Sequence, residues 1–168
     1  MIGRFCIFLL MIVAITALAG PVLIPARPVV VWNATASAPL GLYRVTAAND
    51  LQPGELVLAR TPSAFVALFA ERGYVPVGVP LLKRVAAVAG SIVCRHSMTV
   101  VVDGVAVAVA LHADSDYRLL PTWQGCHRLG PGEAFLLVPT ASASLDGRDF
   151  GVVATSTIAG RAVPLWTW

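Results

Sequence analysis

The stretch that decides the fold is "MTVVVDGVAVAVAL", residues 98–111. Two arms rich in β-branched residues flank the pair Asp103 and Gly104. An Asp-Gly pair between two such arms is typical of a two-residue hairpin turn, because both turn positions favour a positive φ. We therefore predict a β-hairpin over these residues.

Outward from this hairpin, most of the remaining segments also have the composition of strands. Short runs rich in β-branched and aliphatic residues alternate with Pro-Gly, Asn-Asp and other turn pairs. The one exception is "SAFVALFAER", where Thr61 suits a helix N-cap, Pro62 the first helical position and Gly73 the stop. The predicted fold is mainly β, coiled or barrel-like, with one short helix. The predicted strand segments are 27–32, 40–45, 55–60, 77–94, 133–138 and a closing strand pair over 152–166, and the predicted loops are 112–132 and 139–151.

The N-terminal segment is set apart by its hydropathy. Residues 5–24 form a run of 20 without a charge, which is the length that crosses the hydrocarbon core of a bilayer as a helix. The triplet at residues 17–19 also fits a signal cleavage site of the A-x-A kind. Because the apolar run continues through residue 24, we favour an uncleaved transmembrane anchor over residues 1–25, followed by one domain over residues 26–168.

Composition and charge exclude several classes of protein. A chain of 168 residues accommodates one domain with a core and at most one appendage. With 57% hydrophobic and 12% charged residues, it is too apolar for disorder. The net charge of +3 comes from scattered arginines without a basic run, which argues against nucleic acid as a partner.

The cysteines and histidines show no pattern of metal ligands. The sequence has neither a CxxC pair nor a histidine at zinc-finger spacing, so we expect no metal and no cofactor. His96, His112 and His127 are interpreted as surface residues, since no serine-hydrolase signature accompanies them. Cys94 and Cys126 either form a disulfide or remain two buried thiols, and the residues alone leave both alternatives open.

Lysine usage gives the sharpest indication of chemistry. The chain has 11 arginines and a single lysine, Lys83, whose neighbours in "VPLLKRVAAV" are mostly aliphatic. Unlike arginine, a buried lysine can lose its proton and act as a base. The alternative is compositional: an arginine-rich chain has few lysines anyway, and this one then lies on a strand edge. As a base near neutral pH, Lys83 needs a pKa about 2 to 3 units below its ordinary value, which burial can supply.

A lysine base needs a nucleophile, and "VWNATASAPLGLYRV", residues 31–45, offers two hydroxyl groups. Ser37 precedes a sharp turn that leaves a small side chain exposed. Thr35 lies two residues earlier, on the same side of an extended segment, where its hydroxyl can assist an oxyanion. The alternative interpretation is that both are ordinary loop residues.

These segments resemble the boxes of a known family. "NATASAPLGLYRV", "LLKRVAAVAG" and "SASLDGRDFG" are similar, in this order, to the nucleophile, lysine and last boxes of the signal peptidase I family, and most similar to the TraF-type peptidases of conjugative transfer. The resemblance covers nearly the whole chain. It implies the signal-peptidase and repressor-protease fold and a Ser-Lys serine peptidase, held in the bacterial inner membrane with its domain in the periplasm.

Carried over by position, the resemblance implies a role for each matching residue. Ser37 is the acyl-forming nucleophile and Lys83 the general base, while the Ser37 backbone N–H and the Thr35 hydroxyl form the oxyanion hole. Ser144 hydrogen-bonds the lysine, and Arg148 pairs with Asp146, an aspartate with a catalytic role in the TraF-type branch. The periplasmic location favours a Cys94–Cys126 disulfide. Two positions depart from the family pattern, because Ser91 follows Gly90 where Asp is usual and Asp149 replaces an aromatic residue.

The implied substrate is a membrane-borne precursor, such as a conjugative pilin, cut after small residues, with cyclisation as a second outcome. Two alternatives remain open. One is a non-catalytic, membrane-tethered β-module that scaffolds a secretion or conjugation apparatus. The other is a self-cleaving repressor with the same dyad, which the apolar N-terminus and the lack of a DNA-binding region argue against.

Overall fold

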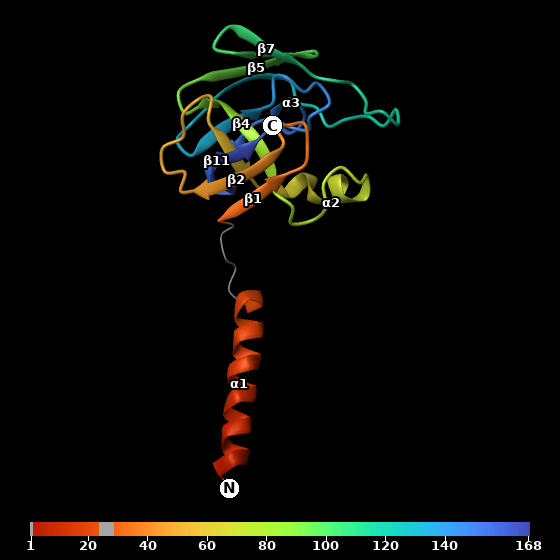
Figure 1. Ribbon diagram of the computed structural model, residues 1–168. Helices are drawn as coiled ribbons and strands as arrows, with labels where there is room; N and C mark the ends of the chain where they lie inside the picture. The colour runs from red at the N-terminus through yellow and green to blue at the C-terminus, as the bar shows by residue number, and fades with distance from the viewer. Residues whose placement is uncertain (1, 24–28) are drawn as a thin grey trace.

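The computed structural model describes residues 2–23 and 29–168, and the latter form two antiparallel sheets with their connecting loops and short helices (Figure 1). The larger sheet has seven strands in the order β1-β2-β11-β3-β4-β9-β10. Its strands are β1 (Val30–Asn33), β2 (Gly41–Thr46), β3 (Leu56–Ala59), β4 (Leu81–Val88), β9 (Glu133–Leu137), β10 (Val153–Ala154) and β11 (Ile158–Thr167). The prediction of a mainly β domain is confirmed.

The smaller sheet contains the predicted hairpin. Its order is β7-β6-β5-β8, with β5 (Ile92–His96), β6 (Thr99–Val102), β7 (Val105–Val109) and β8 (Gly125–Arg128). Asp103 and Gly104 join β6 to β7 with φ values of 48° and 83°, as the two-residue turn requires. The Asp103 carboxylate also accepts a hydrogen bond from Ile92 N at 2.7 Å. In Figure 1 this sheet lies over one end of the larger one.

Four details of the strand and helix predictions were wrong. Strand β8 lies within the segment expected to be a loop, where every one of its residues is exposed. The closing segment does not pair with itself, because β10 pairs with β9 and β11 pairs with β2 and β3. Besides the predicted helix α2 (Ser63–Glu71), the chain forms α3 (Gly147–Phe150) and the 3-10 turn η1 (Thr155–Thr157). Helix α2 has Pro62 rather than Thr61 at its N-cap position.

The N-terminal residues form helix α1 (Ile2–Leu23), which lies apart from the sheets in Figure 1. Residues 1, 24 and 25 of the predicted anchor lie outside the described residues. Judged on the described residues, no helix combines the length and the hydropathy that a membrane crossing requires.

The hydrophobic core joins the two sheets. Val93 and Val100 of the smaller sheet pack with Phe135 and Leu137 of the larger, and all four are fully buried. A second cluster, centred on Val57 and Leu136, fills the space on the larger sheet beneath α3 and the start of β10. Loop residues that pack against this core are therefore held in place.

The four tryptophans fall into two groups. An exposed cluster beside strand β2 contains Trp32 of β1, Trp166 of β11 and Trp168 just beyond β11, and the ring centroids in contact are 5.1 and 5.4 Å apart. Trp123 lies elsewhere, edge-on to Phe135, and donates its indole N–H to the carbonyl of Gly147 at the start of α3.

Candidate active site

The loop between β1 and β2, residues 33–40, carries Ser37 and is hereafter the Ser37 loop. One buried amide holds it together. Asn33 Nδ2 donates to the carbonyls of Thr35, Ala38 and Pro39 at 2.9, 3.0 and 3.1 Å, and Asn33 Oδ1 accepts from both the N–H and the hydroxyl of Thr35. Satisfying three carbonyls with one side chain closes the turn without a charge. The sequence analysis did not single out Asn33, although an Asn that opens a turn is a signal for this role.

The hydroxyl groups of Thr35 and Ser37 lie side by side, 2.8 Å apart. Thr35 has one proton to donate, and its bond to the Asn33 carbonyl oxygen, which only accepts, uses that proton. The hydroxyl of Ser37 is therefore the donor to Thr35. In this arrangement Thr35 orients Ser37 and does not yet point a proton at an oxyanion.

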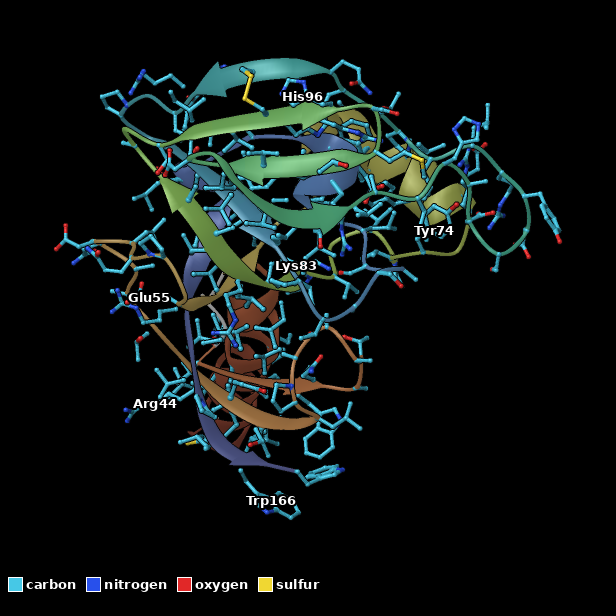
Figure 2. All side chains as sticks on the ribbon, turned by 90° about the horizontal axis from the view of Figure 1, so that it is seen from above. Arg44, Glu55, Tyr74, Lys83, His96 and Trp166 are labelled. Carbon is cyan, nitrogen blue, oxygen red and sulfur yellow. A yellow bond between two sulfur atoms is a disulfide. The ribbon has the colours of Figure 1, made fainter. Side chains whose placement is uncertain are left out.

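Lys83 is buried in β4 and faces inward, as Figure 2 shows near the centre of the domain. Its Nζ donates to Ser144 Oγ at 2.5 Å. Burial lowers the pKa of Lys83 to about 8, and the charge of Arg148 acts in the same direction, while Asp146 and Asp149 oppose the shift. The amine therefore loses its proton within the range of ordinary growth pH.

Residues 138–146, hereafter the Ser144 loop, are held over Lys83 by a buried ion pair. Arg148 donates to both carboxylate oxygens of Asp146, from Nε at 3.0 Å and from Nη2 at 2.8 Å. The same guanidinium donates to the carbonyls of Val138 and Ala141, and Asp146 accepts from Val138 N at 2.9 Å. Because both charges are saturated with hydrogen bonds, the pair fixes the loop that presents Ser144.

A glycine lets α3 pack closely on β9. A Cβ at Gly147 would come within 2.5 to 2.7 Å of the Phe135 ring and the Leu136 carbonyl, so no other residue fits without displacing them. This close approach brings Asp146 and Arg148 onto the sheet beside Lys83.

One cavity of about 930 Å³ brings the predicted residues together. Ser37 and Thr35 line it on one side, and Lys83, Ser144 and Arg148 on another. Its remaining wall is mostly apolar and comes from residues 74–76 and 79–82 and from the loop at 111–120. Asp146 lies behind this lining and is fully buried. Within the described residues no hydrogen bond joins Ser37 to Lys83. The hydroxyl of Ser37 is bonded to that of Thr35 instead, and the amine of Lys83 is bonded to Ser144.

A family model described as signal peptidase, peptidase S26, matches residues 2–168 of the chain. The chain belongs to this signal peptidase family. The family is one of serine peptidases that process exported proteins. Among solved structures, a signal peptidase I from Enterococcus faecalis V583 is 17% identical, with a TM-score of 0.41, and the match covers 68% of this chain and 98% of that one. No curated protein sequence matches the chain.

In this signal peptidase family member, two buried charged residues near the cavity were not predicted. Asp149 accepts a hydrogen bond from Asp146 N at 3.1 Å, and burial raises the pKa of Asp149 to about 6. Arg95 of β5 donates to the carbonyl of Arg148 and, at 3.0 Å, to that of Ser97. Because Arg95 and Arg148 are 53 residues apart in the sequence, no local pattern predicts this contact.

Cys94 and Cys126 form a disulfide between directly opposed positions of β5 and β8 (Figure 2). This resolves the alternative that the residues alone left open. The nitrogens of His96 lie close enough that the three side chains have the spacing of a metal site, with ligand atoms within 4.8 Å of one another. In the disulfide, both sulfur atoms are already bonded to each other.

Proposed function

We propose that the chain is a membrane-anchored endopeptidase that cleaves exported precursor proteins through a Ser37 acyl-enzyme, with Lys83 as the general base. The observation that carries the proposal is the buried amine of Lys83, whose pKa is lowered to about 8, in the same cavity as Ser37. Membership in a serine peptidase family supports the reaction type.

The first step is an exchange of hydrogen-bond partners. Ser37 turns from Thr35 toward Lys83, and the neutral amine accepts the hydroxyl proton as the oxygen attacks a peptide carbonyl. Lys83 is then an ammonium, which Ser144 stabilises by accepting a hydrogen bond from it. The ammonium protonates the leaving amine, and the acyl-enzyme remains. Water, activated by the same amine, releases the product.

The developing oxyanion needs donors on the Ser37 side of the cavity. The backbone N–H of Ser37 has no partner among the described residues, so it is free to donate. Once Ser37 leaves Thr35, the Thr35 hydroxyl is free to rotate from Asn33 and supply the second donor.

The location and the substrate follow from the sequence resemblance. From that resemblance and from the uncharged run over residues 5–24, we propose that residues 1–25 anchor the chain in the bacterial inner membrane with the domain in the periplasm. Ser37 is 13 residues beyond residue 24, so even a fully extended link keeps it within about 47 Å of the bilayer surface. The closeness to TraF-type peptidases favours a pilin-like precursor and, when an amine replaces water at the acyl-enzyme, a cyclic product.

The deciding experiment replaces Ser37 by Ala and, separately, Lys83 by Arg in the full chain. Both variants should abolish precursor processing while the domain stays folded, and Ser37→Ala should leave the unfolding transition close to wild type. Conversion of Arg44, an exposed residue of β2, to Lys is the matched control and should process normally. Full activity in the Ser37→Ala variant would favour the scaffold alternative. Mass spectrometry of the candidate pilin then separates the outcomes, since a ring is one water lighter than the trimmed linear product.

A further inference from the structure

A carboxylate without an ion-pair partner lies beside the proposed base. Asp149 is only 5% exposed and lines the same cavity as Lys83. Its Oδ2 accepts from Asp146 N and completes a capping box at the start of α3. In the described part of the chain no guanidinium or amine lies within 4 Å of Asp149, whereas Asp146 is fully paired with Arg148.

Charged groups surround Asp149 from each neighbouring element. Lys83 comes from β4, Arg148 from α3 and Arg95 from β5, and Asp146 is the N-cap of α3 at the end of the Ser144 loop. Asp114 lines the same cavity from the loop at 111–120. The Arg95 guanidinium is held by two backbone carbonyls, so its charge is not cancelled by a direct carboxylate contact. Among the described residues no hydrogen bond joins Asp149 to Lys83, so the charge of Asp149 acts on Lys83 through space.

We propose that Asp149 is a positioning residue whose negative charge adds to that of Asp146 in favouring the protonated form of Lys83, and thereby shifts the pH at which the peptidase becomes active. The inference rests on the proposed function.

The direction of the effect follows from charge. A nearby anion favours the ammonium form of Lys83 and opposes the burial that favours the neutral form. Burial raises the pKa of Asp149 to about 6, so above this pH the carboxylate is ionised and is present when Lys83 titrates near pH 8. Removing the charge should therefore let Lys83 lose its proton at lower pH.

Asp149→Asn is the discriminating variant, because it removes the charge and keeps an oxygen that accepts from Asp146 N. Lys83 is the only lysine, so full-length protein in detergent, labelled with ¹³C-lysine, gives one side-chain signal whose titration measures this pKa directly. We expect the midpoint to move to lower pH by about half a unit to one unit. Asp116→Asn, which removes an exposed carboxylate, should leave the midpoint in place.

The activity profile provides the second readout. The acidic limb of kcat/KM for precursor cleavage should move by the same amount, which gives up to about tenfold faster turnover in Asp149→Asn below the midpoint. A purely structural cap would instead lower the thermal midpoint and leave the titration of Lys83 unchanged, and that result overturns the proposal. If Asp149→Asn does not fold, Asp149→Ser, which also accepts a hydrogen bond without a charge, answers the same question.

The titration separates this proposal from the proposed function. Measured in a Ser37→Ala background, it requires no catalysis. If the Lys83 midpoint shifts as expected but the chain never processes a precursor, the peptidase proposal is refuted and the coupling of Asp149 to Lys83 is retained. An active peptidase in which Asp149→Asn leaves the Lys83 midpoint unmoved refutes the coupling and retains the peptidase.

Discussion

The two loops that border the cavity are held in opposite ways. The Ser37 loop depends on one uncharged side chain, Asn33, and its Thr35 is exposed. The Ser144 loop is fastened by the buried pair of Asp146 and Arg148. The comparison teaches that the Lys83 side of the cavity is rigid and strongly charged, whereas the Ser37 side is uncharged and can change its hydrogen-bond partners.

The largest expected effect comes from breaking the rigid side. Asp146→Ala leaves the Arg148 guanidinium buried without its carboxylate, and we expect the free energy of unfolding to fall by about 3 to 5 kcal/mol. Urea denaturation measures it. Asp116→Ala, which breaks an ion pair at the surface, is the control and should cost far less. If both variants lose the same free energy of unfolding, the buried ion pair does not fasten the Ser144 loop.

The second prediction concerns pH. The unfolded chain binds the Lys83 proton with a pKa of 10.5 and the folded chain with a pKa of about 8. Between these values the unfolded state holds more protons, so stability should rise with increasing pH, by about 3 kcal/mol at most. A Lys83→Met variant should lack this rise in chemical denaturation at pH 8 and 10. Cleavage activity should likewise increase as the pH passes through 8, and a flat profile would exclude Lys83 as the base.

Removing Asn33, the uncharged side chain that holds the Ser37 loop, should lower the free energy of unfolding by less. Asn33→Ala leaves three carbonyls of the Ser37 loop without their donor, for which we expect a loss of about 1 to 3 kcal/mol. Because Ser37 is positioned by this loop, precursor cleavage should fall far more than the thermal midpoint indicates. Asn49→Ala, in an exposed turn, is the matched control. Full activity in Asn33→Ala would show that the loop is fixed by other contacts.

The smallest effect on stability is expected at Thr35. Thr35→Val keeps the shape of this exposed side chain and removes its hydroxyl, so the free energy of unfolding should change by no more than about 0.5 kcal/mol. If the hydroxyl serves the oxyanion, kcat should fall by about 100-fold. Thr35→Ser keeps the hydroxyl and should retain most activity. Unchanged turnover in Thr35→Val removes Thr35 from the oxyanion hole.

Local sequence patterns correctly predicted the elements that a few neighbouring residues determine. The hairpin at Asp103 and Gly104 and the helix after Pro62 each follow from a few neighbouring residues. Strand β8 was missed because its exposed residues show no alternation, and its pairing with β5 is reinforced by a disulfide to Cys94. Helix α3 was missed because four residues carry no periodicity.

The site shows the same division between local and distant information. Lys83 stands out in the sequence because it is the only lysine and its neighbours are apolar. Its contact with Ser144 spans 61 residues, and in the sequence only the family resemblance indicated it. Asp149 was noted only as a departure from the family pattern and Arg95 was not noted at all, because a buried charge is recognised by what surrounds it in the folded chain, which the sequence does not display.

The placement of the tryptophans supplies a built-in optical probe for each of the two loops. Trp32, one residue before Asn33, belongs to the exposed cluster with Trp166 and Trp168, so emission from this group responds to rearrangement of the Ser37 loop. Trp123, hydrogen-bonded to Gly147, responds to the opposite side. Two variants therefore show, by intrinsic fluorescence in stopped flow, which loop moves first when a precursor binds. One is Trp123→Phe, and the other keeps Trp123 and replaces the three clustered tryptophans by Phe.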